Sequence, residues 1–388
     1  MKKKIAILGS TGSIGITTLN LVKKDKKNFS IVLLTTNNNA QIIFKQAKEF
    51  DVKNVIILNK DKYLQWKKKF IKNKINIYNN FENFNKIIKK KIDYSINAIA
   101  GIDGLEPTLK IIKYTKKIAI ANKEAIICGW NLIQNELVKN KTKFVPVDSE
   151  HFSIFKLIND TTNNRIKKII ITASGGPFYK KKITKNITIS DALKHPNWKM
   201  GKKITIDSST MMNKVFEVIE AKKIFNIDLK KIKILINPNS YVHAIVVFNN
   251  GTIKILAHET KMEIPIYNSI YDKNISYNFY KTKDFDLSKF NNLNLTKPDS
   301  KKFKSLNILK HIPKKDSLFE TVLVTINDEL VDMFLNKKIQ YKDIFFYLFK
   351  IINFKILKKY YMITPNSIRQ ILNVKNLTKK IVNENVNL

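Results

Sequence analysis

Acidic residues, cysteine and long apolar runs are all scarce in this sequence of 388 residues. Asp and Glu number 31 against 71 Lys and Arg, which gives a formal net charge of +40. The single cysteine, Cys128, excludes an intrachain disulfide and fits a reducing compartment. No apolar run is long enough to cross a bilayer, and the basic start "MKKKIAILGS" breaks into a Gly-rich turn too early for a signal peptide. These absences predict a soluble protein of the cytoplasm. No histidine stands near Cys128, so we expect a buried thiol there and not a nucleophile.

The excess of positive charge raises the question of a polyanionic partner, because Lys-rich surfaces bind nucleic acid through its phosphates. The lysines are spread through every segment in company with many Asn and Ile residues, which indicates a compositional bias and not a binding stripe. The sequence contains none of the common nucleic-acid-reading motifs. We therefore expect a small-molecule substrate, no specific nucleic acid and no membrane as partners.

The first 145 residues alternate short apolar runs with amphipathic stretches. The predicted strands are "KIAILG", "FSIVLLTT", "VKNVIILN", "YSINAIAG" and "KKIAIANKE", and residues 16–23 and 39–50 have helical periodicity. Nearly continuous apolar strands that alternate with helices are typical of a parallel sheet covered on both faces. The pattern predicts an α/β fold that begins with a Rossmann-like, doubly wound parallel sheet.

A different pattern begins near residue 150. Four further strands are predicted, "IKKIIITAS", "IKILINPN", "HAIVVFNN" and "TIKILAHE", with a hairpin turn at 249–251 between the last two and a helix over 211–225. A polar stretch over 271–304 has little periodicity and is interpreted as a linker. Three amphipathic segments follow, "DSLFETVLVTINDELVDMFLN", "YKDIFFYLFKIINFKILKKY" and "SIRQILNVKNLTKKIVNEN", and predict a small helical bundle. A chain of this length is expected to hold two or three domains.

The turn "GSTGSIG" follows the first predicted strand and precedes a helix, with Gly9, Gly12 and Gly15 spaced three apart. Glycines in this place let backbone N–H groups approach a pyrophosphate at the helix N-terminus. The second strand ends in "LLTTNNNAQ", which offers no carboxylate for a ribose 2′-hydroxyl. The turn therefore predicts a dinucleotide site, and the missing acid favours NADP(H).

The segment "PVDSEH" sets Asp148 and Glu150 around Ser149, with His151 next. One interpretation is the acidic start of a helix. The other continues the strand "KFVPV", so that both carboxylates share a face and bind Mg²⁺ or Mn²⁺ with a third ligand from elsewhere. In "DSSTMMNKVFEVIEA", Asn213, Glu217 and Glu220 share a helix face beside Lys214. Glu217 is thus a candidate third ligand, with Ser208, Asn213 and Lys214 as donors to an anionic substrate; the alternative is a solvated amphipathic helix with an ordinary Lys/Glu pair.

Two more segments suit an anionic ligand. "TASGGPF", with Ser174 after a predicted strand, can cup a phosphate through its hydroxyl and backbone donors. "HPNWKMG", with His195, Trp198 and Met200 between a Pro and a Gly, is typical of a lid over a site. The alternatives are a plain turn for the first segment and a surface loop with a packed Trp for the second.

Taken together, the blocks "GSTGSIG", "ANKE", "PVDSEH", "SGGPF", "HPNW.MG" and "DSSTMMNK..E.IEA" resemble the 1-deoxy-D-xylulose 5-phosphate reductoisomerase family of the non-mevalonate isoprenoid pathway. The resemblance continues through "NPNSYVHAIVVFNNGT" and implies a homodimeric enzyme. It implies a metal-dependent rearrangement of the substrate to an aldehyde, followed by NADPH reduction to 2-C-methyl-D-erythritol 4-phosphate. It also implies an NADPH-binding domain over 1–149, a catalytic and dimerisation domain with a lid over 150–272, a linker over 273–304 and a helical domain over 305–388.

The resemblance also implies roles for individual residues, and the metal would be Mn²⁺ or Mg²⁺, with Co²⁺ as a further candidate. The implied metal ligands are Asp148, Glu150 and Glu217, which count as catalytic residues together with Lys123. Substrate contacts are implied for Ser149, Glu150, Ser174, His195, Ser208, Asn213, Lys214 and Glu217, with Glu220 tuning the site from behind. Cofactor contacts are implied for Thr11, Gly12, Ser13, Ile14, Asn39, Gly101, Asn122, Lys123, Glu124 and Gly201.

Three residues at two places depart from the family pattern. Asn37 and Asn38 replace a Gly and a basic residue near the expected ribose phosphate, and Val215 replaces a Gly after "NK". We expect local adjustment at Val215, since a β-branched residue is tolerated in a helix. Two other hypotheses stay open: a nucleic-acid-binding or scaffold protein on an old enzyme fold, and a simple dehydrogenase, which would have little use for three converging carboxylates.

Overall fold

The computed structural model describes residues 2–158, 165–181, 183, 186–271 and 287–386. Contacts between residues divide the chain into two compact units. Unit 1 comprises Met1–Ala125, Ile133–Phe152 and Met262–Asp284, and unit 2 comprises Ile126–Leu132, Ser153–Lys261 and Phe285–Leu388. The two units are made of several chain segments each, so they do not test the domain limits inferred above at residues 149, 272 and 304. These limits remain predictions.

Unit 1 is built on a parallel sheet of seven strands in the order β4-β3-β2-β1-β5-β6-β7. The strands are β1 Lys3–Leu8, β2 Phe29–Thr36, β3 Asn54–Ile57, β4 Asn76–Tyr78, β5 Tyr94–Asn97, β6 Lys117–Ile120 and β7 Lys143–Pro146. The predicted doubly wound sheet is confirmed. The strand that was not predicted, β4, is only three residues long and forms the edge, so its apolar pattern is too short to recognise.

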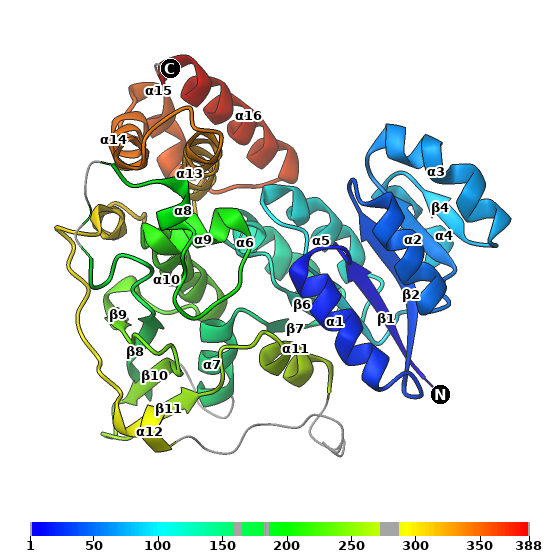
Figure 1. Cartoon of the computed structure of the whole chain (residues 1–388), viewed down its shortest axis with the longest axis horizontal. Helices are drawn as coiled ribbons and strands as arrows, with labels where there is room; N and C mark the ends of the chain where they lie inside the picture. Colours follow the sequence, from blue (N-terminus) through cyan, green and yellow to red (C-terminus); the bar gives the residue numbers. More distant parts are fainter. Residues whose placement is uncertain (1, 159–164, 182, 184–185, 272–286, 387–388) are drawn as a thin grey trace. The chain divides into compact units, whose positions relative to one another are not determined.

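Helices follow the strands of unit 1 and cover the sheet (Figure 1). They are α1 Ser13–Lys24, α2 Ala40–Glu49, α3 Lys60–Lys72, α4 Phe84–Ile87, α5 Leu105–Ile112, α6 Lys123–Lys139 and α11 Glu263–Ile270. Residues of α1, α2 and α11 pack on the strands in one apolar core that includes Ile7, Ile43 and Ile266. Helix α11 lies beside α1, so a segment far along the chain completes the unit (Figure 1).

The order of the strands fixes where a ligand can bind in unit 1. Strand β1 pairs with β2 on one side and with β5 on the other. The chain therefore reverses its winding direction between β1 and β5, and the loops at the carboxyl ends of these strands border a crevice. The Gly-rich turn that follows β1 stands at this switch point.

Unit 2 contains a mixed sheet of four strands in the order β11-β10-β8-β9. These strands are β8 Ile166–Ala173, β9 Ile232–Ile236, β10 Val242–Phe248 and β11 Ile253–Ala257. The predicted hairpin between β10 and β11 is confirmed, with Gly251 at a φ of 86° in its turn. Helix α10, Met212–Phe225, packs Val218 and Phe225 against the β8 residues Ile169 and Ile171.

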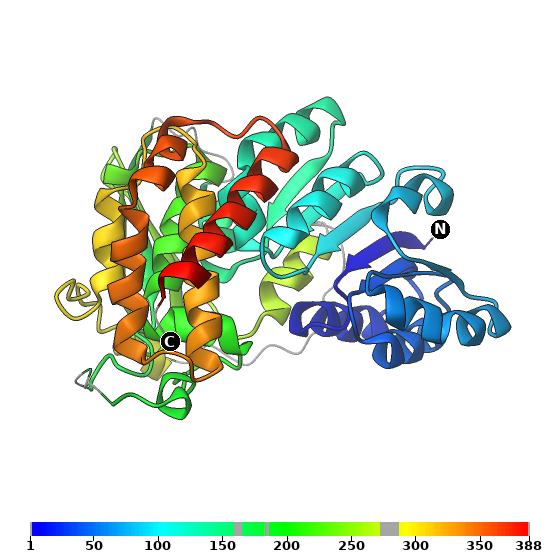
Figure 2. The ribbon, with the colours of Figure 1, turned by 90° about the horizontal axis from the view of Figure 1, so that it is seen from above.

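The remaining helices of unit 2 are α7 Ser149–Ile158, which starts in unit 1, α8 Ile189–Ala192, α9 Lys202–Ser209, α12 Leu287–Asn291, α13 Phe319–Leu335, α14 Tyr341–Ile352, α15 Lys355–Lys358 and α16 Ile368–Asn385. Figure 2 shows α13, α14 and α16 packed side by side in orange and red. None of the described helices is long and apolar enough to span a membrane.

One prediction about an element in this unit is wrong, and one segment is more regular than expected. The second C-terminal helix does not run through to residue 360, because α14 ends at Ile352, where the Asn353 amide donates to the Phe349 carbonyl and Phe354 is extended. Polar side chains that bond nearby backbone in this way favour helix ends. The linker is also more regular than expected from residue 287 onward, since α12 lies there and Thr296 pairs with Ile236. Residues 272–286 of that stretch lie outside the described residues.

Candidate functional site

The turn after β1 has three glycines, and each has a different reason to be glycine. Gly9 has a φ of 79°, and a Cβ there would lie 2.8 Å from the Ala98 carbonyl oxygen. A Cβ at Gly15 would lie 2.4 Å from the Gly9 oxygen, so only glycine lets α1 pack this closely on the turn. A Cβ at Gly12 would lie 3.5 Å from the Gly9 oxygen and 4.0 Å from the Ala98 oxygen, which are ordinary contacts, so the fold itself does not require glycine there. This arrangement fits a turn that tightens at Gly9, admits a pyrophosphate at Gly12 and packs its helix through Gly15.

Hydrogen bonds tie this turn to the end of β2. Gly9 N donates to Thr35 Oγ1 at 2.9 Å, and the Thr11 and Thr36 hydroxyl oxygens lie 2.8 Å apart. Asn39 Nδ2 donates to Thr11 Oγ1 at 3.5 Å. Two of the predicted cofactor residues, Thr11 and Asn39, are thus neighbours, although they lie 28 residues apart in sequence.

The loops after β5 and β6 are joined by one side chain. Asn122 Oδ1 accepts from Ala125 N at 2.9 Å and so caps α6, while its Nδ2 donates to the Gly101 and Ile99 carbonyls. Gly101 has a φ of 75° and nothing within 4 Å of where a Cβ would stand. The amide of Asn122 therefore serves to shape the loop, and the predicted cofactor contact of this residue remains a prediction.

Asp148 and Glu150 stand at a helix start and not on an extended strand. Strand β7 ends at Pro146 and α7 begins at Ser149, so the predicted continuation of the strand is wrong. Ser149 N donates to Asp148 Oδ1 at 3.0 Å, which offsets the cost of an unsatisfied N–H at the helix N-terminus. The helix nevertheless brings carboxylate oxygens of Asp148 and Glu150 within 4.8 Å of each other. Both interpretations of "PVDSEH" thus describe part of what the segment does.

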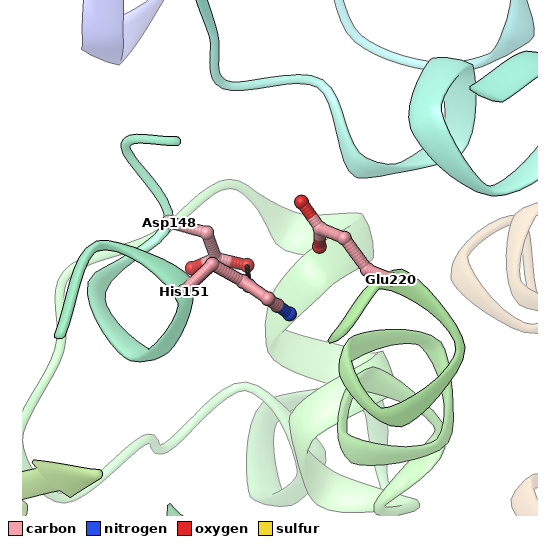
Figure 3. A group of neighbouring side chains, drawn as sticks. All are labelled: Asp148, His151 and Glu220. Atoms are coloured by element: carbon pink, nitrogen blue, oxygen red, sulfur yellow. Dashed lines mark ion pairs between the residues drawn. The ribbon is translucent and has the colours of Figure 1, made fainter. Parts of the chain in front are cut away.

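Two cationic or ionisable partners face Asp148. Lys123 Nζ lies 2.9 Å from Asp148 Oδ2, and His151 Nδ1 lies 3.8 Å from the same oxygen. Figure 3 shows the Asp148 carboxylate and the His151 ring directed at each other, with Glu220 drawn on α10. Burial alone would raise the pKa of Asp148, but Lys123 and His151 lower it well below its usual range. Asp148 is therefore a carboxylate at any physiological pH, as a metal ligand must be.

The predicted polar face of α10 is confirmed, but it is buried. Glu217 is 1% exposed, and its carboxylate accepts from Asn213 Nδ2 and from the Lys214 ammonium. The ammonium also donates to the Thr172 carbonyl at 2.5 Å. Glu220, one turn further on, is 1% exposed as well. The alternative of a solvated amphipathic helix is wrong, because buried charges of this kind are held by specific partners.

Ser174 and His195 meet although 21 residues separate them. Their Oγ and Nε2 atoms are 3.0 Å apart, and Gly176 N donates to Ser174 Oγ at 3.1 Å. The other ring nitrogen, Nδ1, accepts from the backbone N–H groups of Asn197 and Trp198. Burial, with a smaller contribution from Lys214, lowers the pKa of His195 to about 4. The neutral imidazole of His195 therefore joins the "SGGPF" turn to the start of the "HPNWKMG" loop by hydrogen bonds.

Sequence reasoning missed the contacts that hold Ser208 in place. Asp207 is 1% exposed, accepts from Asn327 Nδ2 at 2.8 Å and pairs with Lys203 at 3.0 Å. Lys203 pairs in turn with Asp328 at 2.9 Å. These contacts fix α9, which carries Ser208, to α13. Their only local sign is an aspartate beside Ser208, and the partners on α13 lie 120 residues away.

Cys128 behaves as expected of a structural thiol. It is 1% exposed, and burial raises the pKa of its thiol far above the usual range. A thiol held neutral in this way is a poor nucleophile.

The chain is similar to known proteins along nearly its whole length. Family models described as 1-deoxy-D-xylulose 5-phosphate reductoisomerase, its C-terminal domain and the DXP reductoisomerase C-terminal domain match residues 5–129, 144–225 and 258–381. A 1-deoxy-D-xylulose 5-phosphate reductoisomerase of Pelagibacter ubique is 55% identical over 379 residues, covering 96% of each chain. One of Clostridium tetani is 36% identical and covers 99% of this chain and all of its own.

Solved structures agree with these similarities. The enzyme of Zymomonas mobilis in complex with NADPH matches with a TM-score of 0.88 and 30% identity, covering all of both chains. A DOX-P reductoisomerase in complex with NADPH, fosmidomycin and magnesium matches with a TM-score of 0.89 and 29% identity, covering 98% of each chain.

Proposed function

This chain belongs to the 1-deoxy-D-xylulose 5-phosphate reductoisomerase family, and from that premise we propose how its own residues divide the work of the reaction. The enzyme converts 1-deoxy-D-xylulose 5-phosphate to 2-C-methyl-D-erythritol 4-phosphate in isoprenoid precursor synthesis and depends on NADPH and a divalent cation. The observation that carries the assignment of roles is the set of buried or half-buried carboxylates at Asp148, Glu150 and Glu217, in a chain with only 31 acidic residues.

Asp148, Glu150 and Glu217 are the proposed metal ligands. Their carboxylate oxygens are the donors that Mg²⁺ and Mn²⁺ prefer. The low pKa of Asp148 supports the role, because the group is ionised before any cation arrives. When bound there, a divalent cation stabilises negative charge that develops on adjacent oxygens of the substrate. We propose that Glu220 does not bind the metal itself but influences the orientation and charge of the residues that do.

Lys123 has two proposed tasks. Its ammonium pairs with Asp148 at 2.9 Å and so keeps that carboxylate charged and directed. It also stands at the N-terminus of α6, directly after Asn122 in the loop that follows β6. This position supports a contact near both the nicotinamide and the substrate, with Glu124 beside it.

The substrate is proposed to bind through hydroxyls, amides and one ammonium. The phosphate would be held by Ser174, Ser208, Asn213 and Lys214, with Ser149 near the metal. His195 supports this assignment: with Nδ1 accepting two N–H groups, its proton lies on Nε2 and is donated to Ser174 Oγ, whose own hydrogen is then free for a phosphate oxygen. The loop that carries Trp198 would exclude water from the bound phosphate.

NADPH supplies the hydride that reduces the rearranged substrate. The small Gly12 and the backbone of Thr11, Ser13 and Ile14 at the start of α1 suit its pyrophosphate. Asn39, Asn122 and Gly201 are proposed as further contacts. Asn37 and Asn38 stand where a ribose phosphate would lie and offer amide donors in place of a cation, so we infer that this phosphate is held by neutral hydrogen bonds. Val215 is fully buried in α10, so the bulk added at this position packs inward.

The proposal also covers the oligomeric state and the cellular compartment. We infer a homodimer, supported by the exposed Ile253 and Ile255 on the edge strand β11, and light scattering in solution would test it. We place the enzyme in the cytoplasm, where NADPH is supplied and the one thiol stays reduced.

The decisive experiment compares Asp148→Asn and Glu217→Gln with the wild type, with Glu263→Gln on α11 as a control at an acid outside the site. Oxidation of NADPH by deoxyxylulose phosphate should stop with chelator, return with Mn²⁺ or Mg²⁺, and fall by at least about a thousandfold in both site variants. NADPH binding, measured by its fluorescence, should remain in all variants. If the site variants keep wild-type turnover, or if chelator leaves the rate unchanged, the ligand assignment is wrong. A simple dehydrogenase would oxidise NADPH without metal.

A further inference from the structure

A buried glutamine on α2 contacts the Gly-rich turn at two points. Gln46 Nε2 donates to the Ser10 carbonyl at 3.0 Å, and Ser10 Oγ donates to Gln46 Oε1 at 2.8 Å. Gln46 is 8% exposed and Ser10 is fully buried. Since burying an amide without partners is costly, a glutamine is retained in such a place only where both of its ends are bonded.

Gln46 bonds the turn on the side opposite to strand β2. Ser10 lies between Gly9 and Thr11, two residues before Gly12. Ser10 N donates to the Thr35 carbonyl at 2.9 Å, which holds one edge of the turn on β2. The bonds from Gln46 hold the other edge on α2. The peptide between Ser10 and Thr11, which carries the N–H group of Thr11, is therefore fixed before a ligand arrives.

We propose that Gln46 is a positioning residue for the dinucleotide, acting through Ser10 on the turn that receives the pyrophosphate. It touches neither cofactor nor substrate. The pyrophosphate is common to NADPH and NADH. Removing the hydrogen bonds of Gln46 should therefore weaken the binding of both dinucleotides to the same extent, while substrate affinity and the rate of the chemical step remain unchanged. This inference rests on the proposed function in one respect, the assignment of the pyrophosphate to the Gly9–Gly12 turn.

The test replaces Gln46 with methionine, which keeps the length of the side chain and removes both hydrogen bonds. Dissociation constants of NADPH and NADH for the full chain should each rise roughly five- to tenfold, the loss expected for one or two buried hydrogen bonds. At saturating NADPH, kcat should stay within about twofold of wild type and KM for the substrate should not change. Ser10→Ala, which removes only the hydroxyl half, should show a smaller rise, and Gln65→Met on the exposed face of α3 should show none.

Three results would overturn the proposal. Unchanged dissociation constants with a lower melting temperature would mean that Gln46 only stabilises the fold. A loss of affinity for NADPH alone would mean that Gln46 acts on the ribose phosphate and not on the pyrophosphate. A fall in kcat at saturating cofactor would place it in the chemical step. A failure of the underlying assignment looks different. Gly12→Val adds a side chain where the pyrophosphate is assigned, and if the pyrophosphate binds elsewhere, this variant should bind NADPH and NADH as tightly as the wild type.

Discussion

His195 carries its proton on Nε2, because Nδ1 accepts two backbone N–H groups from the residues that follow it. A second proton would have to replace one of these acceptor contacts and would add a charge near Lys214. Burial of the ring is the main reason why the pKa of His195 is lowered to about 4, and the charge of Lys214 adds to it. One imidazole thus joins the "SGGPF" turn to the lid loop only while it is neutral.

The sign of the resulting pH dependence follows from this lowered pKa. The unfolded chain binds the proton near pH 6.5 and the folded chain only near pH 4, so stability from His195 is complete above pH 6.5 and is lost as pH falls toward 4. We expect the part of substrate binding that depends on neutral His195 to weaken only near pH 4, where the folded chain takes up the proton. A titration of the His195 ring by NMR should give a midpoint near 4, and Ser174→Ala should leave the Nδ1 contacts intact. A midpoint near 6.5 would contradict the assigned tautomer and contacts.

At the scale of elements, α10 is held at both ends by polar and charged side chains, of which only those in its first turn bond the proposed ligand Glu217. Its first turn carries Asn213 and Lys214, whereas its last turn carries Lys223. Lys223 Nζ is 2.8 Å from Asp316 and 3.1 Å from Glu320, and the side chains of Lys223 and Glu320 are at most 2% exposed. Burial alone would lower the pKa of Lys223, but these carboxylates raise it above its usual value. The pair joins the helix that bears Glu217 to the start of α13.

Breaking this pair should cost stability more than activity. Lys223→Met leaves the buried Glu320 carboxylate without its cation, and such a loss typically costs about 3–5 kcal/mol of unfolding free energy. We expect chemical denaturation to show a loss of this size, with turnover per folded molecule close to wild type. The double variant Lys223→Met/Glu320→Leu should recover part of the loss, and Lys230→Met at an exposed site should change nothing. An unaltered unfolding free energy in Lys223→Met would show that the pair contributes no net stability.

The sequence predicted these elements where local pattern decides and failed where distant contacts decide. The parallel sheet follows from continuous apolar runs such as "FSIVLLTT", and α10 agrees with the spacing of four and three between Asn213, Glu217 and Glu220. The break after Ile352 depends on one asparagine that bonds its own backbone, which competes weakly with an otherwise helical pattern. The site shows the same division: Glu217 was found from its spacing, whereas Gln46 and Asn327 act on partners 36 and 120 residues away. Nothing in their neighbourhood distinguishes such polar residues from solvated ones.

At the scale of the whole molecule, the charge is the feature with the least local explanation. The excess of 71 basic over 31 acidic residues leaves 40 positive charges uncompensated, and they are spread over every segment. Some of the described ion pairs join two exposed side chains, such as Lys53 with Asp51 and Lys194 with Asp191, and such pairs contribute little to stability. Repulsion among the remaining lysines should therefore dominate the electrostatic free energy of the folded chain.

This balance predicts that salt stabilises the protein. Raising NaCl from about 0.01 to about 0.15 M shortens the screening length from about 30 to about 8 Å, so distant repulsions fade while close ion pairs persist. We expect the melting temperature to rise by about 2–4 °C, which corresponds to about 1 kcal/mol for a chain with units of this size. Replacing the exposed Lys68, Lys72, Lys89 and Lys90 by Gln lowers the net charge from +40 to +36 and should reduce the rise. A melting temperature that falls with salt would mean that attractive ion pairs outweigh the repulsion among lysines. A compositional bias would then not be enough to explain the excess of lysine.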